Sequence, residues 1–346
     1  MGSMGRTSLA RRNLTSPAHS GNKRERVSDN AQAGWVRLGW QGITCLAPPE
    51  WSLGAIGGDN KQGYLRLDDG ERSRLEVKWN RQEANLERAL EKYLRAMSRP
   101  RGMGRRRRTA EIKRGEKVVS NRALPGKRPE GFTWQDGPEL SGAGVIWYCP
   151  ECRRTVFGQV RGYGREDAVA LARKVFGSME DHATAGRQLW ALYGLEVELP
   201  ENYYLVGQSL MAGYLELCFQ SGRRRLRVGR WGLAETMLAG GGLKEWFEGK
   251  SVNLKSELRW QANDSIVKGH AGLGLEGKSR RPAVRLYRAV SGPAWRLLGR
   301  RDPRETVDGW GRLWHCPETN RIYLVESVYA PEAQLLEQVL ETIVCH

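Results

Sequence analysis

With 346 residues, the chain is longer than one typical domain and fits two units of about 150 residues, each large enough to bury a core. It is 40% hydrophobic and has 13 Trp and 42 Gly, a composition typical of a folded, turn-rich protein. Its apolar runs are too short to span a bilayer, the N-terminal segment lacks the apolar stretch of a secretory signal, and six dispersed cysteines do not form a dense disulfide framework. These features exclude membrane proteins and secreted disulfide scaffolds, and they predict a cytoplasmic protein with reduced thiols.

The positive charge is concentrated in three stretches. The net charge is +17, but residues 1–33, 99–128 and 278–304 together carry a net +22, so the rest of the chain is weakly acidic. Local clusters of this kind favour contact with a polyanion over a uniformly cationic surface.

Residues 1–34 are predicted to form a disordered basic tail, and a first α+β unit follows over residues 35–185. Short apolar alternations bounded by Gly and Pro predict an antiparallel sheet in this unit. The predicted strands include Gly42 to Leu46, Tyr64 to Leu67, Arg74 to Lys78, Val145 to Cys149 and Thr155 to Val160. Apolar residues at helical spacing predict two helices, one around Leu86 to Leu94 and one around Val169 to Met179.

An arginine-rich loop over residues 99–128 interrupts the first unit. Neighbouring like charges repel, so its four consecutive arginines are expected in solvent rather than on a packed face. The guanidinium group binds phosphate through two parallel hydrogen bonds, which favours a nucleic-acid contact over a loop that only aids solubility. The predicted contact residues, which include a second cluster later in the chain, are Arg99, Arg101, Arg105, Arg106, Arg107, Arg108, Arg223, Arg224 and Arg225.

Residues 186–346 repeat the pattern of the first unit. Gly63 to Leu67 has its counterpart in Gly213 to Leu217, and Trp147 to Glu151 has its counterpart in Trp314 to Glu318. The shared Cys-Pro-Glu sequence predicts a hairpin turn in each unit. A helix from Leu335 to Ile343 ends the second unit as the helix near Val175 ends the first.

The predicted fold class is therefore α+β, with two pseudo-repeated domains, each an antiparallel sheet with two helices on one face. The order of elements resembles the PsbP-like α+β fold. The resemblance rests on Ile43 to Trp51 with the strand Gly63 to Leu67, and on the equivalent stretch around Pro200. It implies a binding or assembly subunit without catalysis.

Cys149 and Cys152 have the spacing at which two thiolates reach one zinc ion. A structural zinc site needs four ligands, however, and the second unit has Thr319 where the first has Cys152. Candidate completions are His315 with Cys316, or Cys345 with His346. Free thiols at a hairpin turn are favoured over these completions, so we predict no metal and no cofactor.

Gly272 to Ser279 matches the phosphate-binding loop pattern, in which backbone amides, Lys278 and Ser279 hold a nucleotide and magnesium. That chemistry requires a buried strand before the loop and a helix after it, whereas Pro282 follows almost at once. A Gly-rich turn is therefore favoured. No catalytic triad is found among the five histidines and their possible partners, so an enzyme is the less favoured class.

These observations lead to three functional hypotheses. The first is a non-catalytic protein that binds nucleic acid or another polyanion through its Arg-rich segments. The second is a protein–protein scaffold or adaptor subunit of a larger assembly, and the third is a nucleotide-binding enzyme that uses Gly272 to Ser279.

Overall fold

The computed structural model describes residues 34–70, 72–82, 85–98, 110–120, 122–251, 258–280, 286–287, 289–291, 308–329 and 333–346. Over these residues the protein is largely β, with 52% strand and 18% helix in three antiparallel sheets of four, seven and seven strands. The predicted α+β class is therefore wrong. Several strands are rich in polar residues or glycine, so the alternation by which a strand is recognised is weak in their sequences.

The first seven-stranded sheet has the order β3-β4-β5-β9-β8-β7-β6. Its strands are β3 (Ser52–Gly58), β4 (Gln62–Asp69), β5 (Arg72–Asn80), β6 (Glu111–Arg114), β7 (Glu130–Gln135), β8 (Leu140–Cys149) and β9 (Arg154–Tyr163). Strand β6 lies inside the segment predicted as an Arg-rich loop, and residues 99–109 of that loop lie outside the described residues. The predicted basic tail also lies almost wholly outside them.

The second seven-stranded sheet has the equivalent order β12-β13-β14-β18-β17-β16-β15. Its strands are β12 (Tyr204–Met211), β13 (Tyr214–Ser221), β14 (Arg224–Gly232), β15 (Leu258–Val267), β16 (His270–Ser279), β17 (Gly309–Cys316) and β18 (Arg321–Val328). Each sheet is thus built as a meander of three strands beside a meander of four strands that runs in reverse order.

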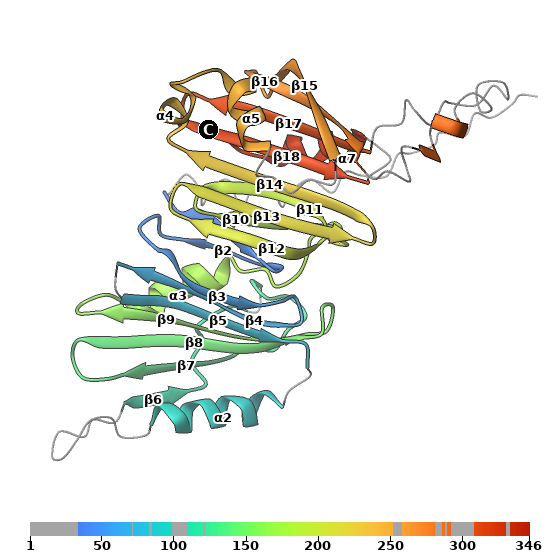
Figure 1. Ribbon diagram of the computed structural model, residues 1–346. Coiled ribbons are helices and arrows are strands. Elements are labelled where there is room, and N and C mark those ends of the chain that lie inside the picture. The colour runs from blue at the N-terminus through green and yellow to red at the C-terminus, as the bar shows by residue number, and fades with distance from the viewer. Residues whose placement is uncertain are drawn as a thin grey trace, which may run out of the picture.

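The four-stranded sheet joins the two halves of the chain and lies between the larger sheets (Figure 1). It contains β1 (Val36–Trp40), β2 (Ile43–Ala47), β10 (Arg187–Leu192) and β11 (Leu195–Pro200). The hairpins meet where Gly39 pairs with Ala191, and a Cβ at Gly39 would lie 2.8 Å from the backbone oxygen of Leu189. Only glycine permits this approach. Gly39 therefore sets how closely β1, in the first half of the chain, lies to β10, in the second half.

The described helices longer than a single turn are α2 (Leu86–Met97), α3 (Ala168–Gly177), α4 (Ala234–Leu238), α5 (Leu243–Ser251) and α7 (Ala333–Thr342). The prediction that the two helices of each unit cover the same face of its sheet is wrong. Ile146 packs with α2, whereas its neighbour Trp147 packs in the core that contains α3. Because neighbouring residues of a strand point to opposite faces, α2 and α3 lie on opposite faces of the first sheet.

The second sheet has the same arrangement. Leu313 packs in the cluster that contains Phe247 of α5, whereas Trp314 packs in the core with Val339 of α7. The inner faces of both seven-stranded sheets, α3, α7 and the four-stranded sheet share one apolar core, in which Trp40 and Trp190 meet edge to face with ring centroids 5.2 Å apart. The two halves are therefore joined through buried side chains as well as through the sheet.

The predicted hairpins with Cys-Pro-Glu turns are confirmed. Cys149 pairs with Arg154 at the end of β8 and β9, and Cys316 pairs with Arg321 at the end of β17 and β18. The helices that end each unit are also confirmed, as α3 and α7.

Gly272 to Ser279 forms most of β16, so it is neither a phosphate-binding loop nor the Gly-rich turn favoured from its sequence. Its glycines allow close strand packing, since a Cβ at Gly272 would lie 2.5 Å from the backbone oxygen of Leu313. The nucleotide-binding hypothesis loses the loop on which it depended.

An ion pair between a buried arginine and a partly exposed glutamate ties β5 to the segment just before α3. Arg74 Nη1 and Nη2 donate hydrogen bonds to the Glu166 carboxylate at 2.7 and 2.9 Å, and only 5% of the Arg74 side chain is exposed. The hydrogen bonds from Arg74 lower the pKa of Glu166. A carboxyl group with a lowered folded-state pKa stabilises the fold above its unfolded-state pKa, and that contribution is lost as the pH falls through the folded-state value.

We therefore predict that Glu166→Gln lowers the free energy of unfolding by about 1 kcal/mol at pH 7, since Glu166 itself is partly exposed. The difference from the wild type should shrink towards zero as the pH falls through the lowered folded-state pKa of Glu166, below which the wild-type carboxyl group is also neutral. Urea denaturation at pH 7 and at a pH below that pKa measures it. The matched control is Glu91→Gln, which removes the exposed Glu91–Arg95 pair of α2 and should cost less than about 0.5 kcal/mol. An equal loss at both pH values would contradict the prediction.

Candidate metal centres

In each half, the segment after the last helix returns to the end of the Cys-Pro-Glu hairpin. A hydroxyl group fixes both turns in the same way. Ser178 Oγ accepts a hydrogen bond from the Leu46 amide at 2.9 Å and donates one to the Val175 carbonyl. Thr342 Oγ1 accepts one from the Glu198 amide at 2.9 Å and donates one to the Val339 carbonyl. The residues three and four positions later are thereby placed beside Cys149 or Cys316.

The second half brings together two thiols and two imidazoles from three chain segments. His270 begins β16, Cys316 ends β17, and Cys345 and His346 follow α7. One ligand atom from each lies within 4.8 Å of all the others. We refer to these four residues as the Cys2His2 centre.

The distances in the Cys2His2 centre match tetrahedral coordination. His346 Nδ1 lies 3.5 Å from Cys316 Sγ and 3.4 Å from Cys345 Sγ, and His270 Nε2 lies 3.6 Å from Cys345 Sγ. A tetrahedral zinc ion with ordinary bond lengths to sulfur and nitrogen separates two such ligand atoms by about 3.5 Å. The four side chains can therefore bind one ion with little movement.

The surroundings of the Cys2His2 centre favour a bound cation. Both thiols are buried, and burial together with the neighbouring Cys316 raises the pKa of Cys345. A buried thiolate is costly unless a positive charge compensates it, and a divalent ion bound to two thiolates provides that charge. Glu318 Oε2 accepts a hydrogen bond from Cys316 Sγ at 3.3 Å and lies 3.9 Å from His270 Nδ1, so its carboxylate lies at the edge of the centre.

The first half brings together Cys149, Cys152, Asp181 and His182, with ligand atoms again within 4.8 Å of one another. We refer to them as the Cys2AspHis centre. Cys149 Sγ lies 3.5 Å from His182 Nδ1, and the Asp181 Oδ1 atom lies 2.8 Å from the same nitrogen. His182 Nε2 lies 2.5 Å from the carboxylate of Glu151.

The carboxylate of Asp181 is fully buried and has several donors. Lys127 Nζ donates to Oδ1 at 2.7 Å, and Trp147 Nε1 donates to Oδ2 at 2.7 Å. Burial raises the pKa of Asp181, but the charge of Lys127 and these hydrogen bonds lower it by more, so the net shift is downward. For His182, burial lowers the pKa, and the hydrogen bond and charge of Asp181 raise it by more.

The two thiols of the Cys2AspHis centre differ in acidity. A hydrogen bond from Cys152 lowers the pKa of Cys149 to about 6, while the same bond and burial raise the pKa of Cys152. Cys45 provides a contrast, since it lies in the apolar core and burial raises its pKa to about 12. The thiolate is the form that binds a metal ion, and a lowered pKa makes the thiolate available at neutral pH.

The sequence predicted only part of these centres. Cys149 and Cys152 lie together, and Cys345 and His346 do complete a four-residue cluster, but with Cys316 rather than with the first pair. His315 is in neither cluster, and Asp181, His182 and His270 were not predicted from the sequence. A signal for His182 is present, because Val175, Ser178 and His182 have the same spacing as Val339, Thr342 and His346.

The predicted polyanion contacts are only partly described. Arg223, Arg224 and Arg225 are exposed at the turn between β13 and β14. The remaining predicted contacts, Arg99, Arg101, Arg105, Arg106, Arg107 and Arg108, lie outside the described residues.

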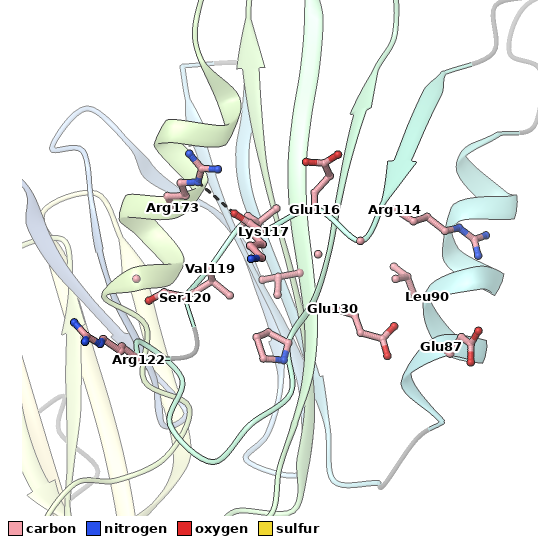
Figure 2. A pocket seen from close by; sticks show the side chains of 16 residues that line it. Glu87, Leu90, Arg114, Glu116, Lys117, Val119, Ser120, Arg122, Glu130 and Arg173 are labelled. Atoms are coloured by element: carbon pink, nitrogen blue, oxygen red, sulfur yellow. Dashed lines mark hydrogen bonds between the residues drawn. The ribbon is translucent and has the colours of Figure 1, made fainter.

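A groove of about 1020 Å³ lies between α2, the β6–β7 edge and α3 (Figure 2). Arg173 Nε donates to the Lys117 carbonyl at 3.3 Å across one end of it. Its charged lining mixes both signs, so it does not form a uniformly positive surface. The charged residues that line it are Glu87, Arg114, Glu116, Lys117, Arg122, Glu130 and Arg173.

No protein-family model matches this chain, and no curated protein matches its sequence. Among the described residues, none of the helices combines the length and the apolar character needed to cross a membrane.

Proposed function

We propose that this protein binds zinc, and that the Cys2His2 centre uses the ion to fix the segment after α7 to the second sheet. The observation that carries the proposal is the set of sulfur-to-nitrogen distances, 3.4 to 3.6 Å, among two buried thiols and two imidazoles. Thiolate and imidazole together favour zinc over magnesium or calcium, which prefer oxygen ligands.

The role of this ion is structural rather than catalytic. Four protein ligands fill a tetrahedral coordination sphere and leave no position for water or substrate, which distinguishes structural from catalytic zinc sites. The ligands come from β16, β17 and the segment after α7, so one ion links three parts of the chain. Because Leu336, Val339 and Leu340 of α7 lie in the shared core, fixing the end of α7 stabilises that core.

Zinc removal tests this proposal. The wild type should bind at least one zinc ion per chain, and Cys345→Ser and His270→Asn should each bind one fewer, as measured by elemental analysis and native mass spectrometry. Free zinc at one hundred times its dissociation constant should stabilise the wild type by about 2.7 kcal/mol, and a chelator should reverse this.

The matched control is Cys218→Ser, which removes a half-buried thiol that belongs to neither centre and should leave the zinc content unchanged. Equal zinc content in the wild type, Cys345→Ser and His270→Asn would refute the proposal for the Cys2His2 centre.

A second candidate function is contact with nucleic acid or another polyanion. The observation that favours it is a run of three consecutive exposed arginines, Arg223 to Arg225, at the β13–β14 turn and the start of β14. Arginines on a hairpin turn reach a phosphate backbone without any rearrangement of the sheet, and they bind it by releasing counterions.

Binding of single- and double-stranded oligonucleotides at several salt concentrations tests this second function. Changing Arg223, Arg224 and Arg225 together to Ala should weaken binding and reduce the slope of log affinity against log salt by about 2 to 3. The matched control changes three dispersed exposed cations, Lys61, Arg88 and Lys244, to Ala and should leave most of the affinity. Absence of binding at low salt, or equal effects of the two triple variants, would contradict this candidate.

A further inference from the structure

The Cys2AspHis centre occupies the place in the first half that the Cys2His2 centre occupies in the second. Cys149 and Cys316 each end the strand before the Cys-Pro-Glu turn, and His182 and His346 each lie four residues after the bracing hydroxyl of Ser178 or Thr342. Two positions therefore keep the same ligand type. At the other two, Asp181 stands where the second half has Cys345, and the second thiol comes from Cys152 rather than an imidazole from β16.

We propose that the Cys2AspHis centre binds a second divalent metal ion through Cys149, Cys152, His182 and one carboxylate oxygen of Asp181. This goes beyond the zinc site proposed above and does not depend on it, because the two centres share no residue.

Two features of this centre support a metal site: the distances between its ligand atoms, and the groups that hold those ligands in place. The 3.5 Å between Cys149 Sγ and His182 Nδ1 equals the sulfur-to-nitrogen distance in the Cys2His2 centre. A ligating imidazole commonly donates a hydrogen bond from its other ring N–H to a carboxylate. His182 Nε2 lies 2.5 Å from the carboxylate of Glu151. In the second half Glu318 follows Cys316 as Glu151 follows Cys149, but it lies 3.9 Å from His270 Nδ1, beyond hydrogen-bond distance, so the close carboxylate partner belongs to the first centre.

The charges explain the buried lysine. Two thiolates and one carboxylate carry three negative charges, and a divalent ion compensates two of them. Lys127 compensates the third, with its ammonium 2.7 Å from Asp181 and only 8% of its side chain exposed, and the buried Arg154 adds a further positive charge 3.4 Å from the Asp181 carbonyl. The Cys2His2 centre has two thiolates and two neutral imidazoles, which a divalent ion neutralises alone. A buried site must be compensated in this way, since an unpaired charge there costs several kcal/mol.

Lys127 and Trp147 also act on Asp181 as partners of a ligating carboxylate. Each binds the carboxylate with a hydrogen bond of 2.7 Å, on different oxygens, and leaves lone pairs for an ion. Binding of the ion requires both sulfurs as thiolates, so a thiol that is still protonated releases its proton to solvent. The mixed ligand set, with one hard oxygen, should hold a soft ion less tightly than the Cys2His2 centre does.

Metal stoichiometry with Cys152→Thr tests this proposal. Threonine is the residue at the equivalent position of the second half, Thr319, so the hairpin accommodates it. Titration with Co²⁺, followed by thiolate-to-cobalt absorbance and by native mass spectrometry, should give two ions per wild-type chain and one per Cys152→Thr chain. Cys218→Ser is the control and should bind two.

The outcomes separate the two centres. One ion in both the wild type and Cys152→Thr would overturn the present inference and leave the Cys2His2 proposal intact. One ion in the wild type and none in Cys152→Thr would support the present inference and refute the other. Two ions in both proteins would overturn the inference, because the second ion would then bind without Cys152. Circular dichroism of each variant confirms that it has folded.

Discussion

The return of each post-helix segment to its hairpin is the constraint on which the candidate sites depend. The hydroxyls of Ser178 and Thr342 each accept a hydrogen bond from the four-stranded sheet and donate one to the helix they follow. These bonds set the direction in which the chain leaves α3 and α7. In the first half, a pair of backbone hydrogen bonds between Thr44 and Glu180 holds the same segment against β2, so Asp181 and His182 lie beside Cys149.

This constraint acts through the shared core. The helices α3 and α7 pack in the shared core with the two large sheets, and they also contact the outer strands of the four-stranded sheet, α3 at β2 and α7 at β11. A change in how one helix is seated would therefore displace a ligand in its own half and disturb the sheet that supports the other helix. The metal ions, in our account, fix the ends of these helices at the edges of the core.

The sequence predicts the parts of the structure that are local. The hairpin turns at Cys-Pro-Glu and the helices α3 and α7 follow from turn residues and from apolar spacing. The fold class does not follow, because strands such as β15 and β16 are polar or rich in glycine and their partners are distant in the chain. The side of the sheet that each helix covers depends on which of two neighbouring strand residues it meets, as Ile146 and Trp147 illustrate.

The candidate centres show the same division. The Cys149–Cys152 pair is visible in the sequence, whereas His270 joins Cys316 and Cys345 only through the pairing of β16 with β17. The likeness to the PsbP-like fold and the scaffold hypothesis stay predictions. The two large sheets have equivalent strand orders, while the two centres differ in two of their four ligands.

Anomalous X-ray diffraction from crystals grown with zinc, recorded above and below the zinc absorption edge, tests the central claim most directly. The account predicts a strong zinc peak about 2.3 Å from the sulfurs of Cys316 and Cys345 and about 2.0 Å from His270 Nε2 and His346 Nδ1. Absence of a peak there, with Cys345 and His346 turned away from the β17–β18 hairpin, would contradict it.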